Sequence, residues 1–459
     1  MTRAISVKYI FMILVLGSLI YVNTLKNEFV SDDIFEIVNN PNISKLSFNG
    51  NLVTFSNSLD YRIGGLNPLV YHLTNLGLHL ANAVLVFLFL RLFFNPFACF
   101  WATLIFVAHP VHTEAVTWIS GRPYLGSTCF FLTSFLLYLK STATSRIRIG
   151  YFLLALITFT GALFFKTFFL AFLFLIILYD LVFARWQRTW KYLFLFTVIS
   201  VVRLIFMLGQ ISDRITSFNQ GSAFNSISNP VFNIVYSFFS HLWLILWPIK
   251  LTLYHEPCSI SVDLLIAGLV LLTGLVLLSP KIFKKSKVLF FAICLFVLFL
   301  APTYSPVMIS WLVAERYAYF PSIAFSMLIA FLVDKFGINK KLSHIIYGFL
   351  VILIAFYCVR TIIRNADWRT HSSLWRATVK VSPLSPKAHN NMGDVYSEEG
   401  DLNAAAKEFS RAIELRPDYW EAYHNLANTY QKMGMHKEAD LNYRKAADLN
   451  PSFYQFMNK

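Results

Sequence analysis

Two adjacent carboxylates, Asp32 and Asp33, stand in the stretch FVSDDIFEIVNNPNI (residues 29–43), just after an apolar run that has the character of a first membrane crossing. Neighbouring carboxylates shift each other's pKa values, and such pairs serve in general acid–base catalysis. At the edge of a membrane they also occur as solvated groups or as caps of a helix. The pair is therefore a candidate site whose function depends on what the rest of the chain places beside it.

A second polar stretch, AHPVHTEAVTWISGRP (residues 108–123), brings His109, His112, Glu114 and Arg122 into the midst of apolar sequence. The two histidines are three residues apart, so on a helix they would share a side and could bind a divalent metal or an anionic group. Histidines that only hydrogen-bond within the protein are the alternative. The sequence leaves a metal requirement open.

Two arginines extend the candidate set. Arg316 lies between Glu315 and Tyr317 in WLVAERYAYFPS (residues 311–322), and Arg203 lies inside an apolar run. A charge within a membrane span is costly unless it is paired or faces a cavity, so Arg203 indicates a functional position. Arg316 has a structural alternative, because arginines near helix ends extend to the lipid headgroups.

The chain that positions these residues has the composition of an integral membrane protein. Of its 459 residues 57% are hydrophobic and 14% are charged, and 46 are Phe. Residues 387–459 hold 9 Lys or Arg against 11 Asp or Glu, so the net charge of +15 comes from the preceding part. There the basic residues stand in short links between apolar runs. This pattern is typical of cytoplasmic loops rather than of a nucleic-acid surface.

Twelve apolar segments are candidates for crossing a bilayer of about 30 Å. They lie near residues 7–25, 69–90, 97–110, 124–139, 150–165, 167–184, 192–209, 231–248, 261–279, 288–303, 321–334 and 345–361. The basic residues Arg3 and Lys8 place the amino terminus in the cytoplasm. Twelve crossings would turn the lysines of residues 281–287 outward, whereas a re-entrant or interfacial segment 231–248 returns them to the cytoplasm. We therefore expect about eleven spans and an outward carboxyl terminus.

After Arg360 the apolar runs give way to charged residues at helical spacing, which indicates a soluble domain. Residues 387–420 and 421–454 align at an offset of 34, the period of the tetratricopeptide repeat (TPR), and a partial repeat precedes them near residues 373–386. The offset pairs Asn391 with Asn425. Since about three repeats are usually needed for stability, we expect the short solenoid to dock on the membrane domain.

The predicted fold is therefore all-α. A polytopic helical membrane domain occupies residues 1–361, and a TPR α-solenoid occupies residues 362–459.

The order of these pieces resembles that of the transmembrane and TPR-containing O-mannosyltransferase family, a branch of the GT-C glycosyltransferases. The resemblance covers nearly the whole chain and rests on FVSDDIFEIVNNPNI, NPLVYHLTNLGLHLANAVLVFLFLRLF, FVAHPVHTEAVTWISGR, AERYAYFPS and the closing repeats. It implies a GT-C type membrane domain with an outward pocket for a sugar on a polyprenyl phosphate. It also implies mannose as the hexose and a protein hydroxyl as the acceptor, which the concave face of the solenoid would present or select.

The resemblance further implies residue roles. Asp32 and Asp33 match the acidic pair of the first outward loop, in which one carboxylate is the base for a weakly nucleophilic hydroxyl. Arg316 matches the arginine of the ERY motif and Arg203 the arginine before an outward loop. Both would hold the lipid phosphate, a leaving group that needs cationic stabilisation more than protonation. Attack opposite that group would invert the anomeric centre. The remaining pocket or acceptor residues are His109, His112, Glu114, Arg122, Glu315 and Tyr317.

The chain departs from the family in two places. It has Lys166-Thr167 where relatives have Lys-Glu, and GRPYLG where relatives have GRADLL. Two alternatives to a protein O-mannosyltransferase stay open. One is a transferase that acts on a lipid or a surface polysaccharide, and the other is a non-catalytic membrane scaffold whose TPRs recruit partners. A transporter is disfavoured, because the sequence contains no inverted repeat.

The expected protein is an integral, multi-pass membrane protein whose active site and TPR domain lie on the extracytoplasmic side. The short chain with few repeats favours a prokaryotic cytoplasmic membrane. Its expected partners are a polyprenyl-phosphate-linked sugar, membrane lipid and an acceptor protein bound through the TPR domain, with no nucleic acid.

Overall fold

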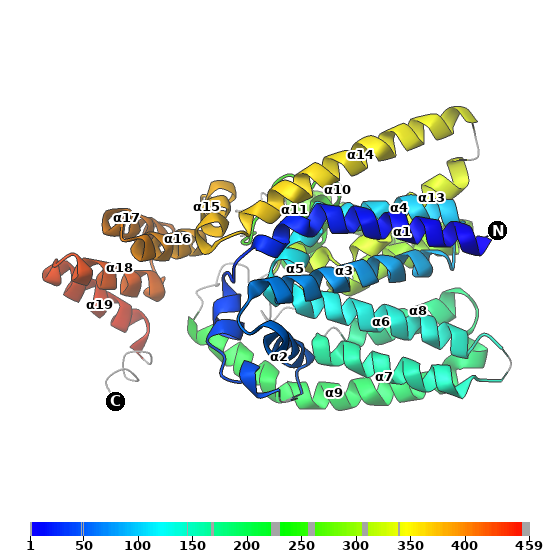
Figure 1. The fold of residues 1–459 in the computed structure, drawn as a ribbon, viewed down its shortest axis with the longest axis horizontal. Coiled ribbons are helices and arrows are strands. Elements are labelled where there is room, and N and C mark those ends of the chain that lie inside the picture. Colours follow the sequence, from blue (N-terminus) through cyan, green and yellow to red (C-terminus); the bar gives the residue numbers. More distant parts are fainter. Residues whose placement is uncertain are drawn as a thin grey trace.

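The computed structural model describes residues 2–46, 48, 50–144, 146–166, 169–221, 230–255, 262–304, 311–337 and 340–451. Every regular element in these ranges is a helix (Figure 1). The first part contains α1 (Thr2–Tyr21), α2 (Leu52–Gly64), α3 (Pro68–Leu90), α4 (Pro96–Ala108), α5 (Thr113–Thr117), α6 (Arg122–Ser141), α7 (Ile149–Phe165), α8 (Phe169–Val182), α9 (Trp186–Gly221), α10 (Pro230–Leu246), α11 (Val262–Lys285), α12 (Lys287–Leu300), α13 (Ser322–Phe336) and α14 (Lys340–Asp367). The last part contains α15 (His371–Val381), α16 (Pro386–Glu399), α17 (Leu402–Leu415), α18 (Trp420–Lys432) and α19 (His436–Leu449).

Each of the twelve apolar segments corresponds to one helix of the bundle, from α1 to α14 with α2 and α5 left aside. Six stretches of the described chain are long and apolar enough to cross a membrane: Ile5–Lys26, Pro68–Leu90, Thr189–Met207, Ile266–Lys285, Lys287–Tyr304 and Leu342–Asp367. The helices Pro96–Ala108, Ile149–Phe165, Ala171–Val182 and Phe232–Leu246 are apolar but shorter. The chain is an integral membrane protein. The total of eleven spans and the re-entrant nature of α10 stay predictions.

Asparagine side chains fix where three helices at the two ends of the bundle begin. Asn67 accepts a hydrogen bond from the Leu69 amide at 3.1 Å, and Asn95 accepts from the Phe97 amide at 3.0 Å. In both cases a proline follows at the first helical position, where its missing N–H is not needed. The Asn51 side chain also caps α2, by accepting from the Val53 and Thr54 amides, with Leu52 in place of a proline. Helix α2 was not predicted, because its mixed polar sequence lies in a loop between apolar runs.

The two ends of the bundle differ in character. Residues 22–67, 109–121 and 311–321 form long connections at the end that faces the carboxyl-terminal helices (Figure 1). The opposite end carries the short basic links, and two of these meet where Arg185 Nη2 donates to the Thr142 carbonyl at 3.4 Å. The candidate catalytic residues on loops thus share one end of the molecule.

Stacked phenylalanines form the core beneath that end. The ring centroids of Phe299 and Phe320 lie 3.9 Å apart, and those of Phe131 and Phe172 lie 4.2 Å apart. These rings come from four separate segments, and their close packing gives the loop before α13 a rigid floor.

Helices α16 to α19 form two TPRs, preceded by α15 as the partial repeat. Within the first repeat α16 and α17 approach closely because Gly393 faces Phe409: a Cβ atom at this glycine would lie 2.6 Å from the ring. Gly400, with a φ of 84°, makes the turn between the two helices. The all-helical prediction, with an apolar bundle followed by TPRs, is confirmed.

The TPR helices pack directly on the loops that carry the candidate site residues. Helix α14 continues to Asp367, past the predicted domain boundary at residue 361. A separate hydrophobic cluster then joins loop residues to the TPR part: Val30, Trp118, Leu253, Trp368, Leu374, Trp375, Met392 and Val395. The Trp118 and Trp368 rings stack at 5.9 Å, and the Glu28 amide donates to the Arg369 carbonyl at 2.9 Å. The solenoid is therefore seated beside the loops that carry Val30 and Trp118.

Candidate functional site

The backbone around the two aspartates has an unusual conformation. Ser31 has a φ of 54°, in the left-handed region that non-glycine residues rarely adopt, and the chain then turns so that the Asp33 amide donates to the Val30 carbonyl at 3.1 Å. A single π-helical turn, Ile34–Val38, follows. This geometry gives the adjacent carboxylates different surroundings.

Asp33 is fully buried and held by the protein. Its carboxylate accepts hydrogen bonds from the Ser120 amide at 2.8 Å, the Ser120 hydroxyl at 2.5 Å and the Val30 amide at 3.2 Å. Burial outweighs these bonds and raises the pKa of Asp33 to about 7. Asp33 thus fastens the loop after α1 to the loop between α5 and α6.

Asp32 is the carboxylate of the pair that reaches the surface. Its recorded hydrogen bond is a long one, from the Ser31 hydroxyl at 3.4 Å. Desolvation by the surrounding loops raises the pKa of Asp32, and the positive charge of Arg316 partly opposes that rise. The charge of Arg316 thus acts on Asp32, although the two residues are far apart in sequence.

Arg316 is held by Glu114. Its guanidinium forms an ion pair with the Glu114 carboxylate, and its backbone amide donates to Oε2 of that carboxylate at 2.7 Å. The guanidinium carbon also lies 5.5 Å from the centroid of the Trp118 ring. Burial opposes the charge, but Glu114 outweighs it and raises the pKa of Arg316 well above its usual range. The side chain, 11% exposed, stays cationic and within reach of a ligand.

Tyr317 and Lys166 lie beside this pair. The Tyr317 ring centroid is 5.8 Å from that of Tyr124, and Lys166 Nζ is 4.6 Å from the Tyr124 centroid. Burial raises the pKa of Tyr317, while the charges of Arg316 and Lys166 oppose the rise. Two cations thus act on one cluster of tyrosines.

Lys166 was not among the predicted site residues. A signal was available, because the predicted topology puts this lysine on the outward side, against the positive-inside bias. Its neighbour Thr167, where relatives have an acid, lies outside the described residues.

Two predicted pocket residues are bound within the protein. Glu315 is fully buried and pairs with Arg364 Nη2 at 3.2 Å, which ties the ERY segment to α14. Arg122 is also fully buried, and it pairs with Asp60 at 2.6 Å. Its other donors reach Asn75 Oδ1 at 2.8 Å, Ser56 Oγ at 3.1 Å and the Tyr71 carbonyl at 3.1 Å. These contacts make Arg122 a clasp between α2, α3 and the start of α6.

The two histidines do not share one face of an α-helix. His109 precedes a 3₁₀ turn, Pro110–His112, and caps it by accepting from the Val111 amide. Its Nε2 lies 2.9 Å from the Ile245 carbonyl, while His112 Nε2 lies 2.8 Å from Ser322 Oγ. Burial lowers the pKa of His112 well below its usual value. Both rings link neighbouring elements, and within the described ranges no set of three His, Cys, Asp or Glu side chains has metal-binding geometry.

Arg203 contacts the end of α7. Its guanidinium carbon lies 4.9 Å from the centroid of Phe164, on the last turn of α7. Phe164 is two residues from Lys166 in the chain, so Arg203 lies near the edge of the cluster formed by Lys166, Tyr124 and Tyr317. The contact of Arg203 with the lipid phosphate stays a prediction.

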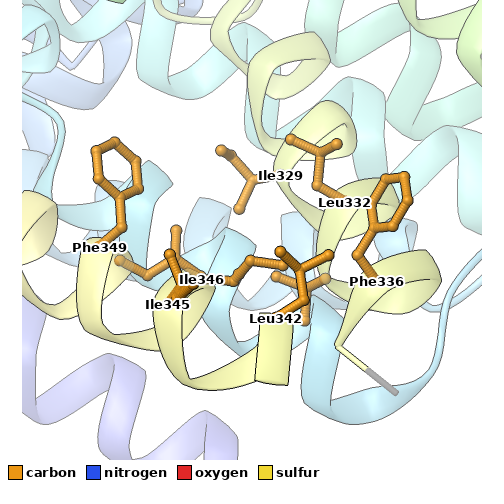
Figure 2. A pocket seen from close by; sticks show the side chains of 9 residues that line it. Ile329, Leu332, Phe336, Leu342, Ile345, Ile346 and Phe349 are labelled. Atoms are coloured by element: carbon orange, nitrogen blue, oxygen red, sulfur yellow. The ribbon is translucent and has the colours of Figure 1, made fainter. Parts of the chain in front are cut away.

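Apolar hollows lie away from these polar groups. One, of about 360 Å³, is bounded by hydrocarbon side chains from α13 and α14, including Ile329, Leu332, Leu342 and Ile345 (Figure 2). Another, of about 530 Å³, lies between α8, α11 and α12. Phe174 and Leu298 line the second hollow, and Phe172 and Phe299, near them in the chain, line a small cavity with Tyr124 and Tyr317. The small cavity, and not the second hollow, is the one that adjoins Tyr124 and Tyr317.

Comparison with known proteins gives matches for both parts of the chain. A TPR repeat family matches residues 393–434, and a tetratricopeptide repeat family matches residues 420–453. The solved structure of ArnT from Cupriavidus metallidurans bound to undecaprenyl phosphate aligns with a TM-score of 0.46 and 15% identity, over 93% of this chain and 78% of that one.

The curated relatives align over most of the chain. Protein O-mannosyl-transferase F38B6.6 from Caenorhabditis elegans is 28% identical over 91% of this chain and 64% of its own length. Human protein O-mannosyl-transferases TMTC2 and TMTC3 are 26% and 27% identical over 87% and 78% of this chain, and 62% and 44% of their own lengths. The chain thus spans less than two thirds of these relatives. The similarity confirms that this TPR-containing membrane protein is related to the protein O-mannosyl-transferases, as its motifs predicted.

Proposed function

We propose that the chain is a GT-C type membrane glycosyltransferase that moves a hexose, mannose by its relationship, from a polyprenyl phosphate to a hydroxyl of an extracytoplasmic protein. The observation that carries the proposal is that the second polar loop joins the other two: its Ser120 binds Asp33, next to the exposed Asp32, and its Glu114 binds Arg316. Transfer from a phosphate needs a base on one side of the anomeric carbon and a cation on the other.

Asp32 is the proposed base. A carboxylate whose pKa is raised is a better proton acceptor at neutral pH, and Asp32 is both raised in pKa and open to solvent. The acceptor oxygen attacks the anomeric carbon, its proton passes to Asp32, and the bond from that carbon to the phosphate oxygen breaks. Attack opposite the phosphate inverts the anomeric centre. Asp33 positions the loop that carries Asp32.

Arg316 and Lys166 are the proposed phosphate ligands. Glu114 holds the Arg316 backbone and side chain together, so the guanidinium is oriented before the substrate arrives. Fixed cations stabilise the charge that develops as the phosphate leaves. Lys166 would add a second charge from the end of α7.

The surroundings of the site support a donor with a lipid tail. The hollow between α8, α11 and α12 is lined almost wholly by hydrocarbon, which suits an isoprenoid chain. The TPR helices, seated beside the same loops, suit presentation of a protein from the extracytoplasmic side.

The experiment is transfer of radiolabelled mannose from a polyprenyl phosphate to protein in a lysate of the source cells, by the purified full chain. Asp32→Asn is expected to lower transfer by about 10²- to 10⁴-fold, the range for loss of a general base. Asp33→Asn should keep most of the activity of the protein that stays folded. Glu36→Gln, at another exposed acid of the same loop, is the matched control.

Label in the lipid-extractable or polysaccharide fraction would show that the acceptor is a lipid or a polysaccharide rather than a protein. Full transfer by Asp32→Asn would remove the proposed base. Failure of the folded wild-type chain to transfer any of several sugars would favour a non-catalytic scaffold.

A further inference from the structure

A cavity of about 310 Å³ lies at the end of the bundle opposite the candidate site, between the link from α6 to α7 and the start of α9 (Figure 1). The side chains that line it are Thr142, Thr144, Ile147, Gln187, Trp190, Lys191 and Tyr192. They combine one cation, one amide and two hydroxyls with aromatic and aliphatic groups. Such a lining suits a ligand with a charged part and an apolar part.

A network of buried contacts holds the two sides of this cavity together. Arg185 donates to the Thr142 hydroxyl and, through Nη2, to the Thr142 carbonyl at 3.4 Å. Its Nη1 lies 3.7 Å from Oδ1 of Asp180, a fully buried carboxylate of α8 that also accepts from the Tyr138 hydroxyl. Arg185 thus joins the link from α8 to α9 to the end of α6, so the cavity is formed before a ligand binds.

The two links that border the cavity are strongly basic. Residues 140–148 and 183–191 contain no Asp or Glu, and their basic residues are Lys140, Arg146, Arg148, Arg185, Arg188 and Lys191. Lys191 is the charged side chain of the lining, and Asp180, the acid nearest to it in sequence, is bound by Arg185. Gln187 and Lys191 are four residues apart in the first turns of α9, whose amino end adds a partial positive charge. The cavity therefore attracts an anion.

An exposed apolar strip continues from the cavity along α9. Trp190, Phe194, Val198, Val202 and Ile205 are spaced by four, four, four and three residues, so they lie on one face of the helix. All five side chains are exposed, within a stretch of α9 that is long and apolar enough to cross a membrane. The strip begins at Trp190, which also lines the cavity. Hydrocarbon along this strip would be continuous with a ligand in the cavity.

We propose that this cavity binds the headgroup of an anionic glycerophospholipid, with its phosphate at Lys191 and Gln187 and its acyl chains along the strip of α9. The phosphate oxygens accept hydrogen bonds from the ammonium and from the side-chain amide. Trp190 and Tyr192 border the glycerol part, as aromatic side chains do at the level of lipid headgroups. A soluble phosphate ester shares the anionic group but has no hydrocarbon to cover the strip. This site is separate from the transfer chemistry and does not depend on the proposed function.

The test is thermal unfolding of the purified, delipidated full chain in a non-ionic detergent, titrated with phosphatidylglycerol, phosphatidylcholine or glycerol 3-phosphate. A ligand of the folded state raises the unfolding midpoint as its concentration rises. Phosphatidylglycerol is expected to act at concentrations at least about tenfold lower than the other two. Phosphatidylcholine carries a compensating cation, and glycerol 3-phosphate has no acyl chains. An equal effect of either one would overturn the proposal, the first by removing the selection for an anion and the second by making a soluble phosphate ester the ligand.

Two lysines at this end separate the cavity from the general charge of the links. Lys191→Gln is expected to weaken binding of phosphatidylglycerol by about 10-fold or more, the range for a hydrogen bond to a charged group, whereas Lys191→Arg keeps the charge and should bind well. Lys140→Gln is the matched control, because Lys140 Nζ lies 4.2 Å from the centroid of the Tyr151 ring and does not line the cavity.

Both lysines are exposed, so neither substitution disturbs the packed core. Lys140→Gln should weaken binding by about twofold or less, as expected for a solvent-exposed charge. Equal weakening by Lys140→Gln and Lys191→Gln would mean that the net charge of this end attracts the lipid without a specific site, which would also overturn the proposal.

Discussion

Two buried arginine–carboxylate pairs lie at the same end of the molecule, and they differ in how completely the protein occupies them. Arg122 is surrounded: Asp60, Asn75, Ser56 and the Tyr71 carbonyl take its donors. Arg316 is bound along one side by Glu114, with aromatic rings around it, and its charge extends to Asp32 at the surface. We call the Arg122–Asp60 pair the closed centre, because Arg122 is fully buried among protein acceptors. We call the Arg316–Glu114 pair the open centre, because the Arg316 side chain is partly exposed.

The aspartate pair repeats this division. Asp33, with three donors, belongs to the closed centre, and Asp32 belongs to the open one. The two neighbouring aspartates thus have different roles. When protein donors occupy the lone pairs of a carboxylate, none is left to bind a ligand. The closed centre maintains the geometry in which the open one can act.

The largest effect is expected from breaking the closed pair. Arg122→Met would leave Asp60 buried without its cation, and loss of one partner of a buried pair costs about 3–5 kcal/mol of the free energy of unfolding. Thermal unfolding in detergent measures this. Arg411→Met, which removes an exposed pair with Glu414, should change stability by about 1 kcal/mol or less. Similar midpoints for the two variants would mean that Arg122 is not a clasp.

The pH dependence of stability tests the other half of the closed centre. The pKa of Asp33 is about 7 in the folded protein and about 3.9 in an unfolded chain, so folding takes up a proton between these values. Its contribution is full below pH 4 and is lost as the pH rises to 7, by up to about 4 kcal/mol. Unfolding midpoints from pH 4.5 to 7.5 should therefore fall less steeply in Asp33→Asn than in the wild type. Parallel profiles would show that Asp33 is already ionised at low pH.

A smaller effect on stability but a clear one on transfer is expected at the open centre. Arg316→Lys keeps the charge beside Glu114 and loses the planar fork, so transfer should fall by about 10- to 100-fold while the unfolding midpoint stays near that of the wild type. A large loss of stability with normal specific activity would show that Arg316 has a structural role, like that of Arg122.

Much of the architecture was predictable because hydropathy and period are local signals. The apolar segments are helices, and the offset of 34 located the TPRs. Helix α2 was missed because its pattern mixes polar and apolar residues outside a membrane span. His109 and His112 have ring centroids 5.6 Å apart, but a 3₁₀ turn that Pro110 begins, rather than an α-helix, brings them together.

The distinction between open and closed groups was not available from sequence. Asp33 is closed by Ser120, 87 residues away, and Arg122 by Asp60 and Asn75 from two other helices. Whether protein groups occupy the hydrogen-bonding positions of a side chain depends on packing between distant segments. The sequences around Arg122 and around Arg316 are similarly polar and do not reveal this difference. Lys166 could have been predicted, because the predicted topology puts this lysine on the outward side, against the positive-inside bias.

The stack of Trp118 on Trp368 has a consequence for modularity. Because α14 runs unbroken into the TPR part and the shared cluster includes Val30 from the aspartate loop, the repeats are not an interchangeable attachment. A chimera joined at residue 361 would uncover this cluster and loosen the segment before Asp32. The shared hydrophobic contacts extend to Tyr396, so a unit exchanged between relatives without disturbing them begins after α16 ends at Glu399.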